Sequence, residues 1–95
     1  MHHVLARITV KPESAEAAKG VLIELVTASR KEAGCVSYAL YQQEGAPHIF
    51  QTVEQWKDKA AADAHMTTPH VGAAIAAAGS MFAMPPEIVA WHPVM

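Results

Sequence analysis

The sequence predicts an α+β fold in which a four-stranded antiparallel sheet carries its helices on one face. Apolar and polar side chains alternate in four short segments, as they do in half-buried strands. One longer segment repeats its apolar residues every three or four positions, as amphipathic helices do, and a second is alanine-rich and compatible with a helix. Along the chain these segments follow the order strand, helix, strand, strand, interrupted helix, strand.

The first strand and the first helix are expected over His3–Val10 and Ser14–Ala33. Every second side chain of the strand is apolar, and the helix repeats its apolar residues at helical spacing. Ser14 is a suitable N-cap for the helix, and Gly34 follows its predicted end. Gly20 lies inside this helix at a cost of about 1 kcal/mol relative to alanine, which predicts a close packing neighbour.

Two further strands are expected over Cys35–Gln43 and His48–Glu54, because both segments alternate apolar with polar residues. The link between them, Glu44–Pro47, contains a glycine and a proline. These residue types favour tight turns, so the two strands are predicted to form a hairpin.

An interrupted helix and a last strand complete the chain. The alanine-rich segment Gln55–Thr67 is expected to be helical and to stop before the Thr68-Pro69 pair. Thr68 is suited to cap a second helical piece with proline at its first position, and this piece is expected to run to about Phe82. The last strand is expected over Ile88–His92.

With right-handed crossovers this order gives the ferredoxin-like arrangement as a single domain over residues 1–95. Only 30 residues are apolar and larger than alanine, and only 17% of the chain is charged. One face of the predicted sheet has no helix to cover it. We therefore expect a homodimer that buries this face.

Composition also excludes several classes of protein. The net charge is −2 and the seven Lys and Arg residues are scattered, so nucleic acid is not an expected partner. Cys35 is the single cysteine, which rules out a disulfide within the chain. No apolar run approaches the roughly 20 residues of a membrane span, and the first residues lack the pattern of a secretion signal. We expect a cytoplasmic protein that does not bind membranes.

No common cofactor motif is present either. The chain has no GxGxxG, no phosphate loop, no CxxC and no HExxH, so the residues predict neither a cofactor nor a metal site. His2, His3 and His92 come close only at the ends of neighbouring strands. Terminal histidines of this kind are usually solvated, so they are not assigned as metal ligands.

Two segments carry a recognisable pattern: SRKEAGCVSYALY at residues 29–41 and PHIFQTVEQWKDKAAADAHMTTPH at residues 47–70. The first contains S-R-x-E-x-G-C, and the second contains F-x-x-x-E-x-W followed by a histidine and a Pro-His pair. In these features the chain resembles the antibiotic biosynthesis monooxygenase family. The resemblance implies a dimeric α/β barrel and a cofactor-independent monooxygenase that oxidises a quinol or related electron-rich aromatic with molecular oxygen.

One departure from the family bears on the reaction. The haem-degrading branch and the quinone-forming members use an asparagine, whereas this chain contains none. Their detailed mechanisms are therefore not carried over. The alternatives that stay open are a haem-binding or haem-degrading relative, a non-catalytic dimeric ligand-binding module, and an isomerase of a small phosphorylated sugar.

The resemblance and the residue chemistry together select the candidate site. His65 and His70 are the candidate catalytic bases, since imidazole titrates near neutral pH. The candidate substrate-binding residues are Trp56, Phe50, Tyr38, Arg7 and Met66, although Trp56 fits a core anchor equally well and Arg7 fits a dimer contact. Structural roles are assigned to Glu54, Arg30 and Glu32. Glu54 is expected to bind the following helix start or Arg30, and Arg30 and Glu32 are expected to fix the turn into Cys35.

We place the expected pocket between the sheet and the interrupted helix, at the end bounded by Trp56, His65 and His70. The break at Thr68-Pro69 is the reason, because a new helix start exposes backbone amides that favour an oxyanion. In this arrangement His70 donates a hydrogen bond, His65 takes the proton, and Phe50 and Trp56 flank the substrate ring.

Overall fold

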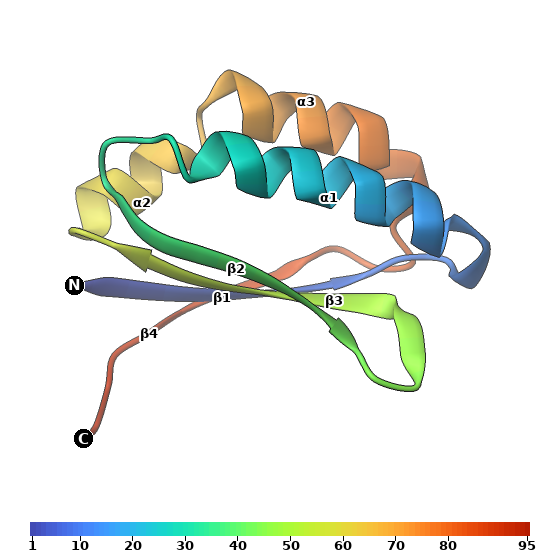
Figure 1. Cartoon of the computed structure of the whole chain (residues 1–95), viewed down its shortest axis with the longest axis horizontal. Helices are drawn as coiled ribbons and strands as arrows, with labels where there is room; N and C mark the ends of the chain where they lie inside the picture. The colour runs from blue at the N-terminus through green and yellow to red at the C-terminus, as the bar shows by residue number, and fades with distance from the viewer.

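Four strands form one antiparallel sheet in the order β2-β3-β1-β4 (Figure 1). The computed structural model describes residues 1–95. The strands are β1 (His2–Thr9), β2 (Cys35–Gln43), β3 (Ala46–Trp56) and β4 (Glu87–Trp91). The helices are α1 (Ala15–Ser29), α2 (Lys59–His65) and α3 (Pro69–Ala78), with short 3-10 turns at Pro12–Ser14 and Gly79–Met81.

All three helices lie on the same face of the sheet, with α1 and α3 side by side and α2 near one end (Figure 1). The predicted fold class, the ferredoxin-like α+β arrangement, is confirmed. None of the helices has both the length and the apolar character needed to cross a membrane.

Three of the predicted helix boundaries are wrong, and the simplest case is α3, which ends at Ala78 and passes into the 3-10 turn Gly79–Met81 instead of running to about Phe82. Helix α1 ends at Ser29 rather than Ala33, because the next amides bond three residues back instead of four, which tightens the chain into a turn: Lys31 N to Ala28 O and Glu32 N to Ser29 O. The predicted N-cap, Ser14, directly precedes α1 but makes no capping hydrogen bond, since it lies in a 3-10 turn.

The segment expected to begin the interrupted helix instead continues strand β3. Trp56 pairs with His2 of β1 and with Cys35 of β2, so the sheet extends two residues past Glu54. Helix α2 starts only at Lys59, where the Asp58 side chain accepts a hydrogen bond from Ala61 N at 2.8 Å. Pairing on both sides outweighs the helix propensity of this alanine-rich stretch.

The predicted break in the helix is confirmed. Thr68 caps α3 by accepting from Val71 N at 3.4 Å, and Pro69 is the first helical residue. The predicted hairpin is also confirmed, with Gly45 adopting a positive φ of 79° in its turn.

The core lies between the sheet and the helices as two adjoining clusters. One cluster, near α2, consists of Val4, Val26, Tyr38, Trp56 and Ala62. The other, near the start of α1, consists of Ile8, Val10, Ala18, Leu22 and Phe50. The opposite face of the sheet has no covering element.

Two glycines have very different surroundings. A Cβ at Gly20 would meet nothing within 4 Å, so the close neighbour expected there does not exist. A Cβ at Gly34 would collide with the Cβ of Ala61, which means that the turn after α1 packs directly against α2.

This contrast gives opposite predictions for two alanine substitutions. Gly34→Ala is expected to lower the free energy of unfolding by about 1–3 kcal/mol, because neither backbone can move away without loss of packing. Gly20→Ala, the matched control, is expected to raise it by about 0.5–1 kcal/mol through helix propensity. Urea unfolding at one protein concentration measures both. Equal stability of the two variants would contradict the packing described for Gly34.

Candidate functional site

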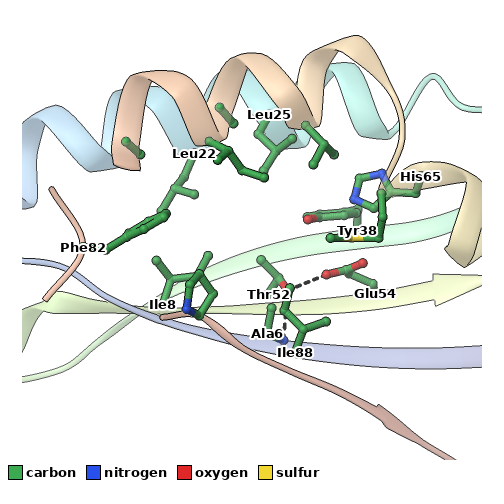
Figure 2. A pocket seen from close by; sticks show the side chains of 16 residues that line it. Ala6, Ile8, Leu22, Leu25, Tyr38, Thr52, Glu54, His65, Phe82 and Ile88 are labelled. Atoms are coloured by element: carbon green, nitrogen blue, oxygen red, sulfur yellow. Dashed lines mark hydrogen bonds between the residues drawn. The ribbon is translucent and has the colours of Figure 1, made fainter. Parts of the chain in front are cut away.

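A cavity of about 100 Å³ lies between the sheet and the helix pair (Figure 2). Its apolar walls come from β1, α1, α3 and the segment that leads into β4, and include Ala6, Ile8, Leu22, Leu25, Val71, Ile75, Phe82 and Ile88. Three lining residues, Met66, Ile75 and Ile88, are 45–54% exposed, which places the opening between α3 and the edge strand β4. The cavity is therefore apolar, partly enclosed and reachable from solvent.

The polar groups of the cavity gather at one end, on Tyr38, Thr52, Glu54 and His65 (Figure 2). Strands β2 and β3 supply the first three on the sheet side, and the last residue of α2 supplies the imidazole above them. The four side chains are buried, with exposed fractions of 1–5%. Buried polar groups of this kind are uncommon unless they are paired or used.

The Glu54 carboxylate is held by two hydrogen bonds. Thr52 Oγ1 donates to one oxygen at 2.6 Å, and the indole Nε1 of Trp56 donates to the other at 3.0 Å. Thr52 Oγ1 in turn accepts from the backbone amide of Ala6 at 3.2 Å, which ties this chain of bonds to β1. Glu54 therefore has a single orientation at the polar end of the cavity.

Tyr38 adds a phenol next to this carboxylate. Its hydroxyl points into the cavity (Figure 2). Burial, and then the negative charge of Glu54, raise the pKa of Tyr38 well above its ordinary value of 10.0. The hydroxyl consequently stays protonated at neutral pH and is available as a hydrogen-bond donor.

His65 lies above Tyr38 and is fixed on two sides. Its ring stacks against Trp56 with centroids 4.6 Å apart, and Tyr38 lies 5.7 Å from it by the same measure. Its Nδ1 lies 2.6 Å from Glu32 Oε2, outside the cavity. Its Nε2 has no hydrogen-bond partner within the protein and is the ring nitrogen available to the cavity that His65 lines.

Glu32 binds a second histidine with the same oxygen, since His70 Nε2 lies 2.8 Å from Oε2. A carboxylate only accepts, so each of these ring nitrogens carries its hydrogen toward Glu32. Neutral His65 therefore holds its proton on Nδ1 and presents the Nε2 lone pair to the cavity. Carboxylate-oriented imidazoles of this kind act as bases in many enzymes.

The structure brings Tyr38, His65 and Met66 of the predicted residues to the cavity, and leaves four others outside it. Phe50 is buried in the core cluster with Val10 and Leu22 and does not line the cavity. Trp56 is fully buried beneath His65, as the core-anchor reading proposed. The expectation that these two rings flank a substrate is corrected, because core packing already covers them.

His70 and Arg7 also lie elsewhere. The ring of His70 reaches Glu32 on the outer side and lines a separate groove between α1 and α3. Arg7 is exposed on the helix-free face of the sheet, since its neighbours Ala6 and Ile8 point to the core. Arg7 was expected either to bind substrate or to contact a dimer partner, and the structure places it away from the cavity.

Two of the three structural assignments change, those of Glu54 and Glu32, while Arg30 keeps its place at the turn into β2. Arg30 does not pair with Glu54. Its Nε donates instead to the carbonyl of Tyr38 at 2.9 Å, which fixes the turn to β2. Glu54 makes no bond to the following helix, and Glu32, assigned to the turn, orients both histidines.

Sequence reasoning missed Thr52 and the cavity role of Glu54. The signal was available, because both share the alternation phase of Phe50 and Trp56 on β3 and must point to the same side. Glu32 carried no such signal, since it lies in a turn. Of the amides expected to be open at the start of α3, that of Val71 is bonded by the Thr68 hydroxyl and that of Gly72 by the Thr68 carbonyl.

The fold and the cavity define a small α+β protein with an apolar cavity that ends at a buried histidine, a tyrosine and a carboxylate. The chain belongs to the antibiotic biosynthesis monooxygenase family, whose sequence model matches residues 1–77.

Three relatives illustrate the extent of the similarity. YcnE of Bacillus subtilis is 34% identical over 84 residues, which cover 88% of either chain. The sll1783 protein of Synechocystis is 33% identical over 85 residues, 90% of this chain, although the match spans only 58% of that protein. The crystal structure of PA3566 from Pseudomonas aeruginosa superimposes with a TM-score of 0.91 at 33% identity, covering 99% of this chain and 94% of that one.

Proposed function

We propose that this protein is a cofactor-independent monooxygenase that oxidises a quinol or a related electron-rich aromatic with molecular oxygen. One observation carries the proposal: a base held by a carboxylate, His65 with Glu32, meets a protonated phenol, Tyr38, at the polar end of an apolar cavity. Family membership supports it, and YcnE is provisionally named as a monooxygenase.

The reaction needs an electron-rich anion, because triplet oxygen reacts slowly with neutral closed-shell molecules. Nε2 of His65 takes the proton from a substrate hydroxyl, and the resulting anion transfers an electron to oxygen. A quinol supplies all four electrons that oxygen requires. One oxygen atom enters a ring C–H position to give a hydroxyquinone, and the other leaves as water with the two hydroxyl hydrogens.

Tyr38 and the apolar walls assist the same step. The hydroxyl of Tyr38 donates a hydrogen bond to the developing oxyanion, and its raised pKa keeps it protonated while it does so. The walls exclude water from the reduced oxygen species and strengthen each polar contact. Glu54, held by Thr52 and Trp56, orients this polar end without being consumed.

Oxygen uptake tests the proposal directly. The protein is treated with EDTA, dialysed, and given a panel of hydroquinones and naphthohydroquinones in an oxygen-electrode cell. We expect uptake above the buffer rate, with a hydroxyquinone identified by mass spectrometry and no peroxide accumulating. Oxygen uptake equal to the buffer rate for every substrate would contradict the proposal. A Soret band that appears on haemin addition and is lost in His65→Asn, in a protein without oxygen uptake, would favour haem binding instead.

The homodimer stays part of this proposal. Across the helix-free face, strand pairing aligns Ala39, Val53, Leu5 and Val89 in one apolar row through the centre of the sheet. Rows on either side are more polar and include Arg7 opposite Glu87 and Gln55 opposite His3. An apolar centre with a polar rim is typical of protein interfaces, and a second copy supplies the matching row.

Val53→Lys is expected to break this dimer, because it places a charge at the centre of the row, where the side chain is 37% exposed in the single chain. Sedimentation equilibrium at micromolar concentration should give a dimer for the wild type and a monomer for the variant. Ile23→Lys, on the outer side of α1, is the matched control and should remain dimeric. A folded monomeric wild type would contradict the assembly.

A further inference from the structure

Glu32, His65 and His70 form a second cluster behind the cavity, and we propose that it binds one divalent transition-metal ion of the zinc type. The three potential ligand atoms are Glu32 Oε2, His65 Nδ1 and His70 Nε2, and all lie within 4.8 Å of one another. Imidazole nitrogen and carboxylate oxygen are the donors that zinc takes in three-ligand sites, with the fourth position open to water.

An ion fits between the three ligand atoms once the carboxylate and one histidine ring shift. Oε2 lies 2.6 Å from His65 Nδ1 and 2.8 Å from His70 Nε2, as hydrogen bonds require. Zinc bonds of about 2.0–2.2 Å in a tetrahedron need ligand atoms roughly 3.3 Å apart. The carboxylate therefore has to withdraw by less than about 1 Å, which its place in a turn permits. The two ring nitrogens, which lie within 4.8 Å of each other, have to approach to about the same 3.3 Å, and the partly exposed His70 ring is the one free to move.

The fold brings the ligands together from three separate elements. Glu32 lies in the turn after α1, His65 is the last residue of α2, and His70 is the second residue of α3. The break at Thr68-Pro69 turns the two helices so that both rings face one carboxylate.

The cluster combines a rigid member with an accessible side. His65 is 4% exposed at its side chain and rests against Trp56, so its ring is fixed. The side chains of Glu32 and His70 are 16% and 25% exposed, so an ion can enter from solvent and keep a water ligand. A metal site is expected to combine a rigidly held ligand with a path by which the ion enters.

Metal binding would also change the base of the reaction, and this part rests on the proposed function. A metal on Nδ1 needs the lone pair there, so neutral His65 must carry its proton on Nε2 instead. Nε2 then becomes a donor toward the cavity and no longer accepts a proton from substrate. We therefore expect the bound ion to inhibit oxygen uptake.

Zinc binding to the EDTA-treated, dialysed full chain tests the site. Isothermal titration with ZnCl₂ should show one strong site per chain. Glu32→Gln and His70→Ala, both at partly exposed positions, should each weaken it by at least about 10-fold. His3→Ala and His48→Ala remove histidines elsewhere and should leave it unchanged. Co²⁺ should show the visible absorption of tetrahedral coordination in the wild type and in these two controls, and should lose it in Glu32→Gln and His70→Ala.

Each outcome separates the two proposals. Affinity that is unchanged in both Glu32→Gln and His70→Ala, or that falls equally in His48→Ala, would overturn the metal site, and circular dichroism confirms that the variants are folded. Zinc binding requires no turnover, so the titration tests the metal site independently of the proposed oxygenase activity. Where uptake is observed, zinc should inhibit the wild type and spare His70→Ala at the same concentration, and equal inhibition of the two would overturn the coupling.

Discussion

Trp56→Ala is expected to cost about 3–5 kcal/mol of the free energy of unfolding, the largest stability effect of any single substitution in this chain. Trp56 is fully buried in the core cluster next to α2, so its removal leaves a cavity. It also donates to Glu54 at 3.0 Å and stacks on His65 at 4.6 Å. Losing the indole therefore leaves a buried carboxylate oxygen without its partner.

A loss of this size is a large share of the 5–15 kcal/mol that typically holds a domain together. Urea unfolding by circular dichroism, at one protein concentration, measures it. Ile23→Ala, at a 50% exposed position on α1, is the control and is expected to change stability by about 0.5 kcal/mol or less. A loss below about 1 kcal/mol for Trp56→Ala would show that the indole is not the anchor described here.

His65→Asn is expected to lower kcat about 10²- to 10⁴-fold, under the proposed function, with little change in KM. An asparagine amide nitrogen occupies nearly the position of imidazole Nδ1, so the variant keeps the donor to Glu32 and removes the base at Nε2. The loss therefore reports on proton transfer rather than on the orientation of the helix. Oxygen uptake across a range of quinol concentrations separates kcat from KM.

Two further variants divide the roles within the site. Glu32→Gln should lower kcat less than His65→Asn, because Glu32 acts by positioning His65. A purely structural Glu32 would change stability and leave kcat at the wild-type value. His48→Ala, outside the site, is the control for any histidine effect. Wild-type kcat in His65→Asn would remove His65 as the base.

Local pattern was enough to predict most of the architecture. Alternation over Val4, Ala6 and Ile8 determines which face of β1 is buried, and the Thr68-Pro69 pair determines where the last helix begins. Both signals act between residues close in sequence. These two signals can therefore be recognised without knowing which elements pack against them.

The end of β3 shows where local pattern fails. Gln55 and Trp56 lead into an alanine-rich stretch that favours a helix, yet they pair with β1 and β2 on both sides. Pairing depends on a strand more than fifty residues away, so no local propensity reports it. The same long-range packing buries Phe50 and Trp56 in the core, although both were expected to be cavity walls.

The sequence by itself determined the fold class, the family and the two histidines as the residues to examine. Tertiary structure decided what each histidine does. His65 and His70 share one carboxylate, 33 and 38 residues away along the chain, and only one of them faces the cavity. Glu32 acquires its role solely because the turn after α1 closes against α2 and α3. Such a role depends on distance in space, which spacing along a chain does not encode.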